Sequence, residues 1–100
     1  MFARLHVVIS SENEKDEQIV KKELLNINPS FSISPSRPYP LKKDHNEFYI
    51  TFQIKEDDIQ SLLNQLNNDW DGEMESCSCY GFNTKMFHPL VYCLEFDIFE

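Results

Sequence analysis

Carboxylates and aromatic rings gather in a short stretch near residue 70, and they are the strongest chemical signal in the chain. If residues 69–79 form a strand, the carboxylates at every second position fall on one face, because successive side chains point to opposite sides. The aromatic residues within and after the stretch are the type that anchors protein interfaces. We therefore predict a surface that binds a basic protein, formed by Asp69, Trp70, Asp71, Glu73, Glu75, Tyr80 and Phe82.

The acidic stretch has three other interpretations. A calcium loop of the EF-hand type needs a glycine at position six and a glutamate at position twelve, and the stretch lacks this spacing. A metal-dependent nuclease needs a cation near the phosphate, yet no lysine or arginine lies between Glu56 and Thr84. A charged strand edge that only faces water is the third alternative.

Three cysteines and a histidine in the C-terminal part are residue types that bind zinc. Cys77 and Cys79 alternate onto one strand face, and His88 and Cys93 follow. We expect the cysteines to pack as small buried hydrophobic residues, with no cofactor, and structural zinc is the alternative. No glycine motif for an oxyanion hole accompanies a cysteine–histidine pair, so we predict that the chain is not an enzyme.

Charge is distributed unevenly along the 100 residues. Residues 1–55 carry 7 acidic and 8 basic residues, whereas residues 56–100 carry 10 acidic residues and Lys85 alone. The net charge of −8 repels nucleic acid and anionic membranes and attracts basic proteins. The odd number of cysteines, and the lack of a secretion signal or of an apolar run long enough to span a bilayer, favour a cytoplasmic location.

Hydrophobic periodicity predicts the elements that position these residues. Strict alternation indicates strands, and apolar residues at every third and fourth position indicate amphipathic helices. Ser11 and Glu14 have the spacing of a capping box at a helix start. Prolines indicate a loop in which we expect Arg37, Lys42 and Lys43 to be solvated. The predicted elements are strands at 2–9, 31–34, 48–54, 69–79 and 90–99, helices at 11–27 and 56–67, and the loop at 35–46.

The order of these elements predicts the fold class. A chain of this length fits one α+β domain, residues 1–100. The order β-α-β-β-α-β, with an additional C-terminal strand, is that of a ferredoxin-like antiparallel sheet with two helices on one face. The predicted core consists of Leu5, Val7, Ile50, Phe52, Leu62, Leu66, Leu94 and Phe96.

In its length, its acidic part from Glu56 to Glu100, its α+β pattern and its lack of catalytic motifs, the chain resembles bacterial immunity proteins of contact-dependent growth inhibition. These small cytoplasmic proteins neutralise toxin domains delivered by neighbouring cells. The resemblance implies a one-to-one complex with a cognate toxin, commonly a basic nuclease whose cleft the immunity protein covers or flanks. It is a resemblance of overall profile and assigns no residue a role by position.

Two other classes of function fit the same composition. A phage-encoded acidic inhibitor, such as an anti-CRISPR protein that mimics nucleic-acid charge, would bind a nucleoprotein. A small-ligand regulatory domain would form a homodimer with a glycine-lined pocket, whereas this chain has 2 glycines. A toxin gene immediately upstream favours immunity, and a prophage setting favours the inhibitor.

Overall fold

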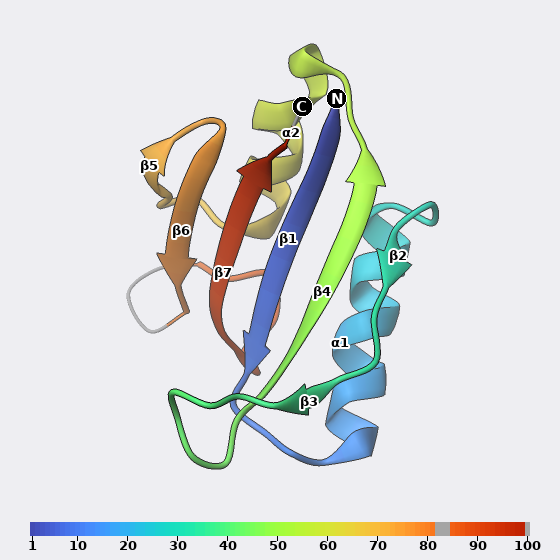
Figure 1. The fold of residues 1–100 in the computed structure, drawn as a ribbon, viewed down its shortest axis with the longest axis vertical. Helices are drawn as coiled ribbons and strands as arrows, with labels where there is room; N and C mark the ends of the chain where they lie inside the picture. Colours follow the sequence, from blue (N-terminus) through green and yellow to red (C-terminus); the bar gives the residue numbers. More distant parts are fainter. Residues whose placement is uncertain (82–84, 100) are drawn as a thin grey trace.

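The computed structural model describes residues 1–81 and 85–99, in which the strands form a single sheet and two helices lie against it (Figure 1). The α+β class predicted from the periodicity is confirmed. Neither helix in this part of the chain is long and apolar enough to cross a membrane. The elements are β1 (Phe2–Ile9), α1 (Glu14–Ile27), β2 (Ser32–Ile33), β3 (Arg37–Pro38), β4 (Asn46–Gln53), α2 (Glu56–Leu66), β5 (Asp71–Glu73), β6 (Ser76–Tyr80) and β7 (Val91–Ile98).

Strand β1 lies inside the sheet, between β4 and β7. Across the described residues the order is β2-β4-β1-β7-β6-β5, and β3 also pairs with β4. The strand pairs along this order are antiparallel. Strand β2 therefore runs in the same direction as β1, with β4 between them. Strand β2 lies within the strand predicted at residues 31–34, whereas β3 replaces part of the loop predicted at residues 35–46.

The C-terminal side of the sheet differs from the prediction. Strand β7 lies beside β1, and the segment after α2 forms a β5–β6 hairpin at the sheet edge instead of one strand over residues 69–79. Eight residues long and largely buried, β7 suits an inner position. Strand β5 has three exposed residues and Gly72 at a φ of 116°, which suits a short edge strand. The exact ferredoxin-like order is therefore not confirmed.

Helix α1 begins two residues later than the predicted capping box. The side chain of Asn13 caps the helix, because its Oδ1 accepts the N–H of Lys15 at 2.7 Å. Ser11 instead uses its hydroxyl to donate to Asp16 at 2.7 Å. The helix ends at Ile27, where the Asn-Pro sequence prevents its continuation, as predicted.

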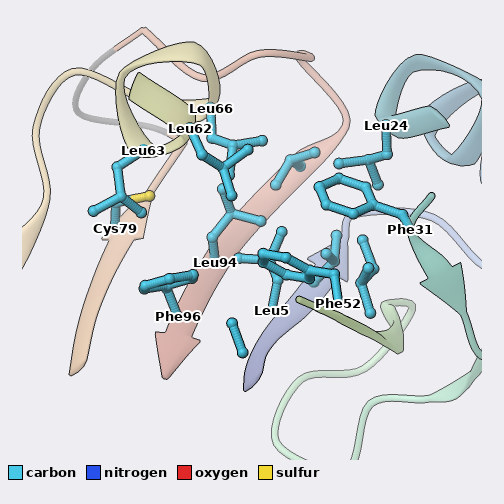
Figure 2. Close-up of a cluster of buried hydrophobic side chains, with 14 of the residues drawn as sticks. Leu5, Leu24, Phe31, Phe52, Leu62, Leu63, Leu66, Cys79, Leu94 and Phe96 are labelled. Atoms are coloured by element: carbon cyan, nitrogen blue, oxygen red, sulfur yellow. The ribbon is translucent and has the colours of Figure 1, made fainter. Parts of the chain in front are cut away.

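The hydrophobic core lies between the two helices and one face of the sheet. Figure 2 shows leucines of α2 and Leu24 of α1 directed toward the central strands. The burial of all eight predicted core residues is confirmed, and the largest exposed fraction among them is 7%. Packing of this kind places the apolar stripe of each helix on the same face of the sheet.

The other face of the sheet, here called the open face, has no described helix against it. The loop of residues 39–45, here called the strap, crosses one end of this face, at the bottom of Figure 1. The N–H of Tyr39 donates to the carbonyl of His45 at 2.9 Å and closes the strap at its base. Val8 and Cys93 pair on the open face and are nevertheless buried. We infer that the strap covers this end of the open face and leaves the other end accessible.

Truncation of Leu66 to alanine should lower the free energy of unfolding by about 2–5 kcal/mol, because Leu66 is fully buried and its loss leaves a cavity. Urea unfolding followed by circular dichroism measures the change. Leu25→Ala in α1 is the matched control, since Leu25 is 41% exposed, and should cost less than about 1 kcal/mol. An unchanged midpoint for Leu66→Ala would show that α2 does not pack as described.

Candidate protein-binding surface

Two rows of polar side chains cross the open face at β5, β6 and β7. Each row joins a carboxylate of β5, a serine of β6 and a carboxylate of β7 through the register of the strands. Side chains paired in this way lie on the same face and contact one another. The rows are Asp71–Ser78–Glu95 and Glu73–Ser76–Asp97, and their four carboxylates are here called the acidic surface.

The acidic surface is shallowly hollowed and accessible to a partner. A depression of about 180 Å³ is lined by Asp71, Ser76, Cys77, Ser78, Glu95 and Asp97. Asp71 and Glu73 are exposed, and the side chain of Glu95 is 58% exposed. The hydroxyl of Ser76 donates to Asp97 at 2.9 Å, which orients that carboxylate. Exposed carboxylates grouped in this way produce a local negative potential.

A cationic border lies beside the acidic surface on β1. Arg4 pairs in register with Asp97, and its guanidinium lies 5.1 Å from the ring centre of Tyr49 and 5.0 Å from that of Phe99. These cation–π contacts hold the guanidinium over rings. Along this edge, the open face therefore changes from carboxylates on β5–β7 to Arg4 on β1 and the ring of Tyr49 on β4.

The structure brings together only some of the residues predicted for partner binding. Asp71 and Glu73 lie side by side on β5, whereas Asp69 precedes the strand and Glu75 lies in the hairpin turn. The predicted single face of four carboxylates is therefore wrong. The chain reverses direction after Glu73, so Glu75, the next carboxylate in the alternation, lies in the turn and not in the strand.

The aromatic residues predicted as anchors have different environments. Trp70 is half-buried, packs against the core, and donates from Nε1 to the carbonyl of Leu63 at 2.8 Å. It therefore ties the segment after α2 to that helix. Tyr80 is 45% exposed on the open face and is accessible to a partner. Phe82 lies outside the described residues.

Glu95 and Asp97 are functional candidates that the sequence prediction missed. Their signal was present, because they alternate with Leu94 and Phe96, which point to the core. What the sequence did not show was that β6 and β5 lie beside this part of β7. Only the pairing places Glu95 in one row with Asp71, and Asp97 in one row with Glu73.

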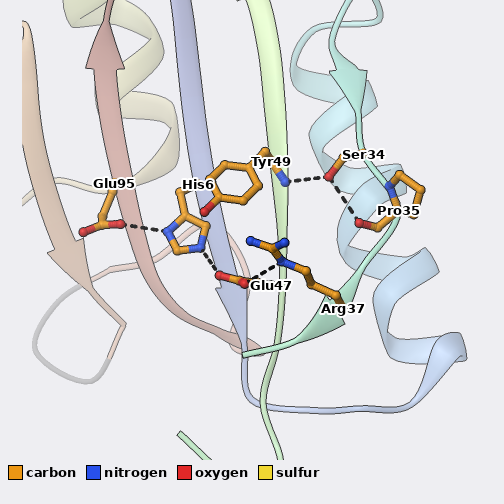
Figure 3. Close-up of polar contacts among 7 residues, drawn as sticks. All are labelled: His6, Ser34, Pro35, Arg37, Glu47, Tyr49 and Glu95. Atoms are coloured by element: carbon orange, nitrogen blue, oxygen red, sulfur yellow. Dashed lines mark hydrogen bonds and ion pairs between the residues drawn. The ribbon is translucent and has the colours of Figure 1, made fainter. Parts of the chain in front are cut away.

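A histidine held between two carboxylates lies next to the acidic surface (Figure 3). Nδ1 of His6 lies 2.7 Å from Glu95, and Nε2 lies 2.7 Å from Glu47. Glu47 also accepts a bond of 2.8 Å from Nε of Arg37. Stacking against Tyr49, at 4.5 Å between centroids and 16° between planes, fixes the imidazole. This group is here called the histidine bracket.

The histidine bracket is satisfied when His6 carries a proton on both ring nitrogens. An ionised carboxylate only accepts hydrogen bonds, and a neutral imidazole offers a single N–H. His6 and Glu47 are 8% and 3% exposed, so their charges need the partners that surround them. Both nitrogens are engaged with protein carboxylates, which gives the bracket a structural role linking β1, β4 and β7.

The cysteines lie on both sides of the sheet. Cys77 and Cys79 belong to the core cluster on the helix side, whereas Cys93 pairs with Val8 on the open face. A zinc ion cannot be held jointly by all three across a sheet, so the hypothesised site with His88 does not form. Within the described residues, no group of three or more histidine, cysteine or acidic side chains is arranged to hold a metal.

A separate cavity of about 390 Å³ lies at the end of the sheet near the N-terminus. The N-terminal ammonium of Met1 donates to the carbonyl of Ile54 at 2.8 Å beside it. The described residues that line it include no glycine, in contrast to the pocket expected for a small-ligand regulatory domain. They are Met1, Ile27, Asn28, Gln53, Ile54, Lys55, Asp58 and Leu62.

No family model, curated protein or solved structure matches this chain significantly. The function therefore has to be inferred from the surface chemistry described above. The two features that carry such chemistry are the acidic surface and the histidine bracket beside it.

Glu47→Gln should lower the free energy of unfolding by about 1–3 kcal/mol, because the amide cannot supply the charged acceptor shared by His6 and Arg37. Urea unfolding at neutral pH measures the change. Glu23→Gln is the matched control, since Glu23 is exposed on α1, and should change stability by less than about 0.5 kcal/mol. Equal stability of the two variants would contradict a structural role for the bracket.

Stability should decline as the pH rises above about 9. Burial raises the pKa of Cys77 to about 11 and the pKa values of Cys79 and Cys93 to about 12, from the ordinary 9.0. Between about pH 9 and 12 the unfolded chain loses these protons while the folded chain keeps them, so the unfolded state gains stability.

Urea unfolding between pH 8 and pH 11 measures this decline, with Cys79→Ala as the comparison. The variant should start from a lower stability and decline less steeply, because one of the three shifted thiols is gone. Parallel curves for the two proteins would contradict protonated burial of Cys79.

Proposed function

We propose that this chain is a non-enzymatic immunity protein that binds and neutralises a cognate toxin domain through its acidic surface. The observation that carries the proposal is the grouping of four carboxylates on adjacent strands of an uncovered sheet face. A partner that recognises this surface must present lysine or arginine side chains. The bacterial contact-dependent growth inhibition systems are the setting that this proposal implies.

A basic nuclease domain is the partner class that fits best. A cleft that binds phosphates has a positive potential, and a carboxylate-rich surface can occupy or flank it. The same attraction accelerates the encounter of the two proteins, an advantage for an inhibitor that must act before the toxin does. Lys85 is the sole basic residue after Lys55, so the C-terminal part adds little repulsion.

The open face also offers an aromatic anchor for such a complex. A stable interface buries roughly 800 Å² on each partner and is anchored by aromatic side chains. Exposed Tyr80 lies on β6, on the same face as the acidic surface. The scaffold in this proposal is a ferredoxin-like arrangement in which β7 lies beside β1 and the β5–β6 hairpin extends the sheet. The location in this proposal is the cytoplasm, where the toxin acts.

A phage-encoded acidic inhibitor of a nucleoprotein is the second candidate, supported by the same two rows of carboxylates. It would use the surface as a mimic of nucleic-acid charge. The two candidates differ in the identity of the partner that co-purifies: the product of an adjacent toxin gene, or a nucleic-acid-guided complex of the host.

Asp71→Lys combined with Glu73→Lys should weaken binding to the co-purifying toxin domain by 10-fold or more at low salt, because the attraction becomes repulsion. The loss should arise mainly from slower association and should shrink at high salt. Surface plasmon resonance at two salt concentrations measures both rates, after circular dichroism has shown that the variant is folded.

The matched control is Glu12→Lys combined with Glu23→Lys, which changes the net charge equally at exposed positions away from the open face. It should retain most of the affinity. If both double variants bind equally well, the acidic surface only faces water and the toxin binds elsewhere.

A further inference from the structure

A β-bulge turns Tyr92 toward the open face. Val8 pairs with Cys93, but the next residue, Ile9, pairs with Val91, so Tyr92 is an extra residue on β7. In a regular strand, Tyr92 would point to the opposite side from Cys93 and into the core. The bulge re-aims such a side chain, a device common next to binding sites.

Strand β6 is built to fit this bulge. The N–H of Gly81 donates to the carbonyl of Tyr92 at 2.9 Å. A side chain at position 81 would collide with the carbonyl oxygen of Val91, so the close approach requires glycine. The backbone of Tyr92 is therefore held from both neighbouring strands, by the bulge against β1 and by the hydrogen bond from Gly81 at the end of β6.

The ring of Tyr92 is already in contact with a cation. Nζ of Lys42, from the strap, lies 5.1 Å from the ring centre, within the range of a cation–π interaction. Tyr80 and His45 contact the same ring edge-on, with centroid distances of 5.9 and 5.0 Å. The aromatic group forms a platform on which an ammonium or guanidinium is stabilised.

Lys42 can leave this platform without unfolding of the strap. Residues 40–44 are all exposed, and Leu41 is 81% exposed. The strap is held at its base by the bond between Tyr39 and His45 and by the pairing of β3 with β4. Rotation of the flexible side chain of Lys42 breaks none of these contacts.

We propose that the ring of Tyr92 is a docking site for a lysine or arginine side chain of a basic partner, and that Lys42 occupies this site in the free protein as an internal competitor. The proposal rests on the proposed function for the source of that side chain. Charge complementarity supports it, because Glu95 lies two residues along β7 from Cys93, on the same face and 58% exposed. A cation that docks on the ring would therefore lie on the same sheet face as this carboxylate.

A short peptide tests the site without the toxin. The probe is acetyl-Arg-Gly-Arg-Gly-Arg-amide, and its control has citrulline in place of each arginine, which removes the charge and keeps the shape. Nuclear magnetic resonance titration should shift the ring resonances of Tyr92 with the arginine peptide and not with the citrulline peptide. Equal shifts with both peptides, or none with either, would overturn the proposal.

Variants of the two neighbouring lysines separate competition from simple charge. Lys42→Met and Lys43→Met each remove one positive charge from the strap, but only Lys42→Met vacates the ring of Tyr92. Lys42→Met should bind the arginine peptide about 2–5-fold more tightly than Lys43→Met does, as expected for loss of a weak cation–π competitor. Equal affinities would overturn the role of Lys42.

Variants of Tyr92 test the ring itself. Tyr92→Phe keeps the ring face and should retain the peptide affinity within 2-fold, whereas Tyr92→Leu should lower it by about 5-fold or more. Thermal unfolding establishes that both variants are folded, and a Tyr92→Leu protein that binds as well as Tyr92→Phe would overturn the proposal. Failure here leaves the toxin assay with Asp71→Lys and Glu73→Lys unaffected, so the two proposals are judged separately.

Discussion

Packing of both helices on one face of the sheet is the constraint on which the other features of this structure depend. The apolar side chains of β1, β4 and β7 on that face are buried in the core. Because successive side chains of a strand point to opposite faces, the other side chains of these strands lie on the open face. Polar groups on a sheet face without a helix must be paired or solvated. The histidine bracket pairs such groups and the acidic surface leaves them solvated, whereas the strap covers the end of the open face where Val8 and Cys93 are buried.

Glu95 connects the interior charge network with the surface proposed for binding. One of its oxygens faces His6, while most of its side chain remains exposed among the carboxylates of β5 and β7. A partner's cation near Glu95 would therefore also act on the charge that holds His6. A substitution of Glu95 would therefore change both the stability of the fold and the proposed binding. Glu47, on the buried side of His6, is the better position for measuring the effect of the histidine bracket on stability alone.

The open face is divided between carboxylates and aromatic rings. In the proposed complex, the acidic surface would provide attraction over a distance, which favours encounter, and Tyr80 and Tyr92 would provide short-range contact, which favours a long-lived complex. The bulge in β7 brings Tyr92 to the same face as the carboxylates. Lys42, held over Tyr92, adds a positive charge from the N-terminal half of the chain at the border of this surface.

The sequence by itself determined the α+β class, the two amphipathic helices and the buried residues, because periods of 2 and 3.6 are local properties of the chain. It also identified Asp71 and Glu73 as candidates. Only the tertiary structure decided that Asp69 and Glu75 leave their strand and that Trp70 packs on the core. The same holds for the neighbours of Glu95 and Asp97, and for the bulge at Tyr92. Strand pairing joins segments far apart in the chain through backbone hydrogen bonds, which every residue type except proline can make, so a local sequence pattern does not show which strands will be neighbours.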